Sequence, residues 1–246
     1  MNTRKLMLCG LLWPVLSSGL LEAREQEASP DAKRPLLINA DQLHSKLNDD
    51  NLRILDARSE SDYAKGHIPG AIRVDVSQWK NMAAAEGGFH DAKGWSRQLG
   101  QIGLKNGMSV AVYGSKLSDT ARIWWLLKYA GVKDVSLLDG GWEWWKKQHG
   151  PADTKSSAVL PTKFEPHFQA DRLAEFASLK DSFSAKTTKL VDTRSTEEFK
   201  EGRIPGSTHL EWKELLAADG RFKSKTQLKQ LFRERGILPA ETAVCY

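Results

Sequence analysis

The sequence predicts an α/β protein built from two copies of one domain, each a parallel β-sheet with helices on both faces. Residues 55–74 recur as residues 191–210, 136 positions later, with seven identities in the first 18 aligned positions. Short apolar runs alternate with helical patterns, as parallel sheets require. Solenoid repeats have periods of roughly 20–50 residues, so this longer spacing indicates a duplicated domain.

Composition agrees with a soluble globular protein. The 246 residues suffice for two ordinary domains, and 40% hydrophobic with 27% charged residues is ordinary. The net charge of +5 is spread along the chain without interleaved aromatic residues. We therefore expect a solvated basic surface that attracts small anions weakly, and no binding to nucleic acid.

Residues 1–23 have the layout of a secretory signal peptide. Basic Arg4 and Lys5 precede an apolar run over 6–21, and Ala23 offers a small residue before a cut. The alternative is an uncleaved anchor, which Pro14 and the length of the run disfavour against a span of about 20 apolar residues. We expect an exported protein, periplasmic or secreted, with no membrane contact after removal of this segment. Residues 24–34 are polar and predict a disordered tail.

The mature chain would hold a single thiol, because Cys9 lies in the signal peptide and Cys245 is the other cysteine. An internal disulfide is then excluded, and the thiol is either incidental or chemical.

The first domain is expected over 35–149. A strand at 36–38 leads through the capping residue Asn39 into a helix, followed by an apolar strand at 52–57. A short helix at 61–65 ends at Gly66. The later elements are a strand at 71–74, a helix at 95–102, an apolar strand at 108–113 buried on both faces, a helix at 118–130, a strand at 135–138 and a helix over 141–148.

Residues 150–162 are rich in Ser, Thr, Pro and Ala and predict a linker. The second domain, 163–246, is expected to repeat the order of the first. Its elements are a strand near 164–168, helix 171–180, strand 189–192, helix 196–200, a turn at 203–206, a helix from the capping box at 224–227 to 236, and a strand from 242. Nothing in these 246 residues repeats the first domain's 118–148, so the second domain is expected to be incomplete, present by its amino-terminal part.

Residues 63–74, YAKGHIPGAIRV, resemble the signature near the start of rhodanese domains, which are thiosulfate and 3-mercaptopyruvate sulfurtransferase-like. The second copy keeps Phe199 and the Ile-Pro-Gly of 204–206, with Arg203 in place of His67. The Asp-x-Arg at 56–58 and 192–194 and the LDGGW at 138–142 also fit the family. The resemblance covers about 35–246 and implies tandem rhodanese domains, in which the amino-terminal domain is usually catalytically silent.

The resemblance also implies a chemistry. In the family a cysteine follows the central strand and opens a loop whose backbone N–H groups and helix N-terminus lower the thiol pKa. Its thiolate takes a sulfane sulfur from a small donor and passes it to a thiol or cyanide-like acceptor, without a cofactor or a metal.

The first domain has Gly114 after its central strand and therefore no thiol at this place. Aligning the glycines at 103 and 236 places Tyr246 on Tyr113, so the expected nucleophile is the residue after Tyr246. A register slip of two residues would instead make Cys245 the catalytic residue. Thiosulfate- and mercaptopyruvate-using members carry an arginine where this chain has Glu198, and a carboxylate would repel an anionic donor.

Other marked residues are interpreted as structural. Asp56 with Arg58 predicts an ion pair that holds a turn, and His67 predicts a hydrogen-bonding turn residue. The tryptophans are assigned to packing: Trp124, Trp125, Trp142, Trp144 and Trp145.

Two functions follow. The first is an exported sulfurtransferase, with the 246-residue form expected to be inactive and poorly stable. The alternative is a catalytically inactive rhodanese-like protein that binds or scaffolds.

Overall fold

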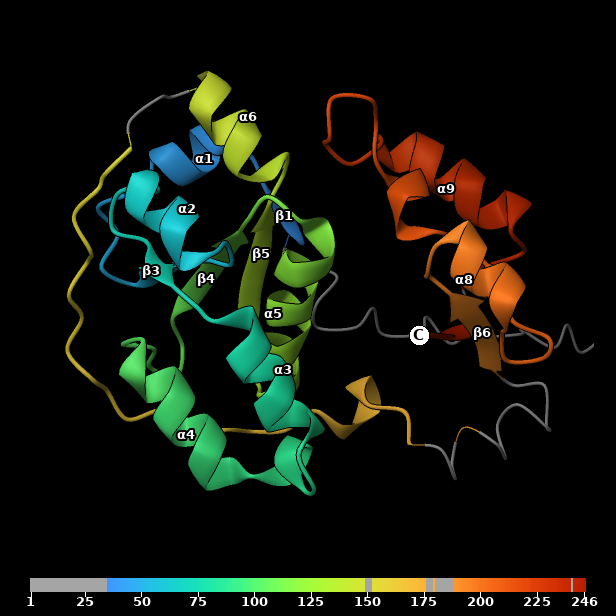
Figure 1. Cartoon of the computed structure of the whole chain (residues 1–246), viewed down its shortest axis with the longest axis horizontal. Coiled ribbons are helices and arrows are strands. Elements are labelled where there is room, and N and C mark those ends of the chain that lie inside the picture. Colours follow the sequence, from blue (N-terminus) through green and yellow to red (C-terminus); the bar gives the residue numbers. More distant parts are fainter. Residues whose placement is uncertain (1–34, 149–151, 176–178, 180–187, 240) are drawn as a thin grey trace, which may run out of the picture.

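A computed structural model describes residues 35–246 except 149–151, 176–178, 180–187 and 240 (Figure 1). The predicted signal peptide and tail lie outside the described residues. Within the described part of the chain, no helix is long and apolar enough to cross a membrane.

The first domain is built on a five-stranded parallel sheet, as the sequence predicts. The strand order is β1-β5-β4-β2-β3, so β4 lies at the centre, between β2 and β5. All-parallel sheets need cover on both faces, and this one has it. The strands are β1 (Leu37–Ile38), β2 (Leu52–Asp56), β3 (Ile72–Arg73), β4 (Ser109–Tyr113) and β5 (Asp134–Leu138).

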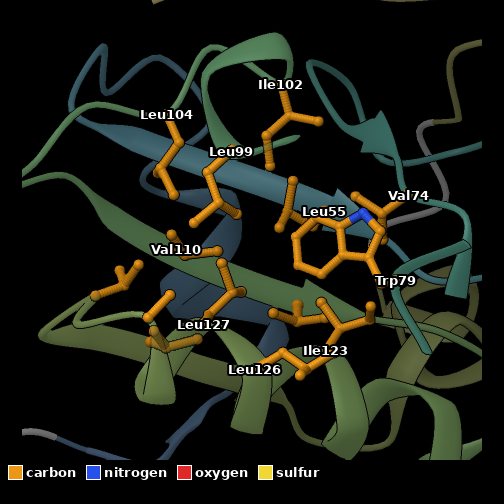
Figure 2. Packing of buried hydrophobic residues seen from close by; sticks show 14 of the residues in the cluster. Leu55, Val74, Trp79, Leu99, Ile102, Leu104, Val110, Ile123, Leu126 and Leu127 are labelled. Carbon is orange, nitrogen blue, oxygen red and sulfur yellow. The ribbon is translucent and has the colours of Figure 1, made fainter. Parts of the chain in front are cut away.

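Helices cover both faces of this sheet (Figure 1). On one face α3, α4 and α5 bury a large apolar cluster that contains Trp79, Leu99 and Leu127 (Figure 2). On the other face α1 and α6 bury a smaller cluster that contains Leu43 and Trp145. The helices are α1 (Ala40–His44), α2 (Glu60–Lys65), α3 (Val76–Ala84), α4 (Ala92–Gln101), α5 (Leu117–Tyr129) and α6 (Gly141–Gln148).

The second domain has a parallel sheet in the order β7-β6-β8. Its described part therefore has three strands against the five of the first domain. The elements are β6 (Thr188–Asp192), α8 (Thr196–Glu201), β7 (Thr208–His209), a 3₁₀ helix (Trp212–Leu215), α9 (Lys225–Glu234) and β8 (Thr242–Cys245). Both predicted capping sites, Asn39 and Ser224, form capping boxes.

Residues 152–169, here called the strap, run along the first domain without regular secondary structure (Figure 1, yellow). The hydroxyl of Thr162 donates to the carbonyl oxygen of Leu104 at 2.6 Å, and Asn106 exchanges two hydrogen bonds with the backbone of Glu165. Phe164 is 1% exposed and belongs to the first domain's larger core cluster. The strap thus includes most of the predicted linker and the first residues assigned by sequence to the second domain.

The strand expected near 164–168 does not form, because the backbone of this stretch hydrogen-bonds to Ser96, Asn106 and Ala130 of the first domain. The helix expected over 171–180 lies partly outside the described residues, and a 3₁₀ helix occupies Ala170–Arg172.

A clasp joins the two domains. It consists of the second domain's hairpin, residues 216–222, and the turn after β5 in the first domain. The backbone N–H of Phe222 donates to Asp139 Oδ1 at 2.9 Å. The Arg221 guanidinium lies 4.4 Å from the ring centroid of Trp144, a cation–π contact. Glycine at position 140 leaves room for the side chains of Arg221 and Trp144, because a Cβ there would lie 2.5 Å from Trp144 Cβ.

Candidate functional site

The Asp-x-Arg of the first domain forms a buried network at the carboxyl end of β2. Asp56 is fully buried and accepts hydrogen bonds from the Arg58 side chain and, at 2.6 Å, from the hydroxyl of Tyr113. Arg58 also donates to the carbonyl oxygen of Gly66 at 2.8 Å. Burial, and then the charge of Asp56, raise the pKa of Tyr113, which keeps its hydroxyl protonated. The predicted ion pair is confirmed, and it holds the turn that follows α2.

The second copy repeats the contacts of the arginine, whereas its tyrosine hydroxyl, that of Tyr246, donates to Ser207 Oγ at 2.9 Å. Arg194 Nη2 lies 2.6 Å from Asp192 Oδ2 and donates to the carbonyl oxygen of Gly202 at 2.7 Å. The hydroxyl of Tyr246 accepts from the N–H of Ile204 at 3.0 Å, as Tyr113 accepts from Ile68 at 3.1 Å. Hydrogen bonds from Arg194 lower the pKa of Asp192 to about 2. The aspartate is therefore charged in the folded protein down to acidic pH.

Strand register fixes which residues of the two domains correspond. Leu55 of β2 lies beside Val112 of β4, and Val191 of β6 lies beside Cys245 of β8. Because Leu55 and Val191 are equivalent in the repeat, Cys245 corresponds to Val112, inside the central strand. Tyr246 then corresponds to Tyr113, which agrees with their shared contacts.

Cys245 is a free cysteine and, as a residue, exposed. Partial burial of its thiol raises the pKa, so the thiolate fraction at neutral pH is lowered. A strand residue of this kind lacks the loop that aims backbone N–H groups at a sulfur. The environment of Cys245 does not activate it.

The loop after β4 begins at Gly114, the position at which the sequence resemblance predicts a cysteine in catalytic domains. Gly114 accepts a hydrogen bond from the N–H of Trp142 at 3.1 Å, and a Cβ at Gly114 would lie 2.7 Å from Thr120 Oγ1. The first domain therefore packs this position closely and carries no thiol there. Beside it lies a pocket of about 420 Å³ at the carboxyl edge of the sheet, where ligands of open α/β sheets bind. Its charged lining includes Glu60, Asp62, Arg73, Asp75, Lys116 and Asp119.

His67 is a structural turn residue, as predicted. Its ring stacks on Tyr63 with centroids 3.7 Å apart, Nδ1 lies 2.9 Å from the carbonyl oxygen of Tyr63, and Nε2 lies 3.2 Å from that of Lys155. Glu198, the residue that departs from the family pattern, accepts from the N–H of Ser195 and completes the capping box of α8.

The marked tryptophans take part in packing. Trp142 covers the Arg58 guanidinium at 4.0 Å, and Trp125 stacks on Tyr129. Among the described residues, no group of histidine, cysteine and acidic side chains could hold a metal ion.

Sequence reasoning missed the role of Tyr113 and Tyr246 in supporting the turn. The signal was available, since Tyr113 ends β4 and Tyr246 directly follows β8, at similar spacing from the repeated motif.

Comparison with known proteins places this geometry in context. The rhodanese-like domain family matches residues 39–148 and 175–246. The sulfur carrier protein TtuD of Thermus thermophilus is 27% identical over 235 residues, covering 86% of this chain and 81% of that protein. Human 3-mercaptopyruvate sulfurtransferase is 26% identical over 243 residues, covering 91% of this chain and 79% of that protein. The crystal structure of SseA from Escherichia coli has a TM-score of 0.75 at 23% identity, covers 86% of this chain and 87% of that chain, and shares the fold.

Proposed function

Because the chain belongs to the rhodanese-like domain family, we propose that it is a sulfurtransferase that works through a cysteine persulfide in its second domain. The observation that carries this proposal is the repeated strand register. Tyr246 directly follows β8 and accepts a hydrogen bond from the N–H of Ile204, as Tyr113 at the end of β4 accepts one from the N–H of Ile68. The position after Tyr246 is where an N–H-rich loop would begin. Relatives named as sulfurtransferases support the same activity.

The proposed reaction needs a thiolate and no net redox change. The thiolate attacks the outer sulfur of a small sulfane donor and forms an S–S bond. The bond between that sulfur and the rest of the donor breaks, and the leaving group departs with the electron pair. A thiol or cyanide-like acceptor then attacks the persulfide's outer sulfur and releases the enzyme thiolate.

We assign the nucleophile to the residue position that follows Tyr246. Cys245 is the alternative within the described chain, but its thiol pKa is raised and its place in β8 corresponds to Val112. The first domain has Gly114 at this position and takes a structural role. We further propose that residues 1–23 direct export to the periplasm or outside the cell, which mass spectrometry of the mature chain would test by finding Arg24 at its amino terminus.

Thiocyanate release from cyanide tests the activity, with thiosulfate, mercaptopyruvate and polysulfide as donors. The 246-residue form is expected to release none. A longer form with cysteine directly after Tyr246 is expected to release thiocyanate. Serine at that added position should abolish the reaction, and Cys245→Ser in the same form should leave it unchanged.

Two results would contradict this proposal in different ways. Thiocyanate release by the 246-residue form that Cys245→Ser abolishes would make Cys245 the nucleophile and the register assignment wrong. Failure of every form with every donor would favour the alternative, a non-catalytic binding or scaffolding protein.

A further inference from the structure

The turn between α4 and β4 contains the one Asn-Gly pair of the chain, Asn106 and Gly107. The N–H of Met108 donates to the carbonyl oxygen of Lys105 at 3.2 Å and closes this turn. Asn106 and Gly107 are exposed, and a Cβ at Gly107 would meet nothing within 4 Å. No described residue accepts a hydrogen bond from the N–H of Gly107. The backbone nitrogen of Gly107 is therefore open to water and unhindered by a side chain.

The strap holds the side-chain amide of Asn106 through both of its polar atoms. Nδ2 donates to the carbonyl oxygen of Glu165 at 2.8 Å, and Oδ1 accepts from the N–H of Glu165 at 2.9 Å. The hydrogen bond to Oδ1 draws electron density from the amide carbon and stabilises negative charge that develops on the oxygen during nucleophilic attack. Glu165 directly follows Phe164, which is buried in the larger core cluster. The Asn106 amide thus fastens the strap beside a core residue.

We propose that Asn106 is a site of spontaneous deamidation, and that the reaction unfastens the strap at Glu165. The backbone nitrogen of Gly107 loses its proton to water and forms a bond to Cγ of Asn106. The bond between Cγ and Nδ2 breaks, and this nitrogen leaves as ammonia after taking a proton from water. Water then opens the succinimide ring and leaves aspartate or isoaspartate at position 106. Glycine favours ring closure because it lacks a Cβ and has wide backbone freedom.

Neither product keeps both hydrogen bonds to the strap. Aspartate has no donor for the carbonyl oxygen of Glu165, so two acceptor oxygens would face each other across the former 2.8 Å contact. Isoaspartate adds a carbon to the main chain and displaces the carboxylate from the strap. Both products therefore loosen the strap beside Phe164. The reaction consumes only water and involves no oxidation or reduction, so this inference stands independently of sulfur transfer.

Peptide mapping by mass spectrometry tests the modification. The 246-residue chain is incubated in ¹⁸O-labelled water at mildly alkaline pH, because the nucleophile is a deprotonated nitrogen, and is then digested with trypsin. The fragment 106–116 should take up the label and separate into aspartate and isoaspartate forms. The fragment with Asn81, which is also exposed but precedes Met82, should stay unlabelled over the same time. The proposal is overturned if Asn106 keeps its amide, or if it converts no faster than Asn81.

The effect on the strap is tested with Asn106→Asp and with the incubated chain itself, which does not depend on the folding of a variant. Hydrogen exchange followed by mass spectrometry should become faster over residues 160–168 in both, while α1 exchanges as before. The melting temperature should fall by about 4 °C, the effect of one lost hydrogen bond in a domain of this size.

Asn81→Asp adds the same charge at an exposed position of α3 and is the matched control. Its strap should exchange hydrogen as slowly as that of the unaltered chain, and its melting temperature should be unchanged. Circular dichroism establishes that each variant is folded. Equal exchange over 160–168 in the unaltered, the incubated and the Asn106→Asp chains would overturn the role of Asn106 in fastening the strap.

Discussion

At the scale of single residues, the same carboxylate–guanidinium pair occurs once in each domain, in two different environments. Asp56 and Arg58 lie beneath Trp142, sealed from water, whereas the Arg194 side chain beside Asp192 is 35% exposed. A fully buried ion pair loses much of its Coulombic gain to desolvation. Its value here is positional, because each arginine holds the carbonyl oxygen of a turn glycine. The pair sets the path of the chain beside the sheet's carboxyl edge.

Asp192 should make the second domain sensitive to acid. Its pKa is about 2 in the folded chain, against an ordinary value of 3.8. Above a pH of about 5 the carboxylate is charged in both the folded and the unfolded chain, and its stabilisation is complete. As the pH falls from about 5 toward about 2, the unfolded chain binds the proton first and stability is lost. Thermal unfolding followed by circular dichroism should show that the melting temperature of the unaltered chain falls more steeply with decreasing pH than that of Asp192→Asn.

Glu197→Gln removes an exposed carboxylate from α8 and is the matched control. Its melting temperature should fall with pH as steeply as that of the unaltered chain. Identical pH profiles for the unaltered chain and Asp192→Asn would contradict the assignment.

At the scale of elements, the strap stabilises the first domain as a helix or strand would, although it has no regular structure. Val159, Phe164 and Phe168 pack against the larger core cluster, and Phe168 stacks on Tyr129. Gly100 makes the close approach possible, because a Cβ there would lie 2.3 Å from the carbonyl oxygen of Thr162. The first domain's core is therefore completed by residues beyond its last helix.

Phe164→Ala should destabilise the first domain by about 3–5 kcal/mol, the usual cost of removing a buried phenylalanine. Leu160→Ala, in the same strap but 87% exposed, should change little. Urea unfolding followed by tryptophan fluorescence reports chiefly on the first domain, since Trp212 is the one described tryptophan in the second. Loss of stability confined to the second domain in Phe164→Ala would show that the strap belongs there.

Elements with strong local signals could be predicted from the sequence. Asn39 and Ser224 begin helices at the predicted residues, and the apolar run around Val110 forms the central strand. The strap could not be predicted, because its partners lie about 60 residues away and its own alternation of phenylalanine and polar residues imitates a strand. Helix α3 was missed too, although Asp75 caps it.

The candidate site was predicted in part. Alignment of the helix-ending glycines placed Tyr246 opposite Tyr113, and the strand register agrees with it. The exposure of the turns that follow α2 and α8 could not be predicted, because it depends on which segments distant in sequence pack against each turn. Sequence alone shows that Arg203 replaces His67, but not that one is exposed and the other buried.

At the scale of the whole molecule, the clasp relates the domains through few residues. The hydrogen bond from Phe222 to Asp139 and the contact of Arg221 with Trp144 lie close together, and Phe222 also packs against the first domain's core. An interface this local should respond to single substitutions, as small interdomain interfaces do.

Asp139→Ala combined with Arg221→Ala should release the second domain while leaving both folds intact. The N–H of Phe222 loses a charged acceptor, at a cost of about 1–3 kcal/mol. Small-angle X-ray scattering should then report a larger radius of gyration with unchanged circular dichroism. Arg233→Ala, on the exposed side of α9, is the control. Scattering profiles that superpose for the double variant and the unaltered chain would rule out this role of the clasp.

The strap also governs the order of events during synthesis on the ribosome. Domains of a nascent chain generally fold as units from the amino terminus onward. Here the first sheet has all its strands once Leu138 has emerged, yet its core stays open until Phe164 follows. The nascent first domain must therefore wait for a further stretch of translation, exposing apolar surface that chaperones would recognise. A ribosome stalled between these two residues should hold a chain that proteases cut easily.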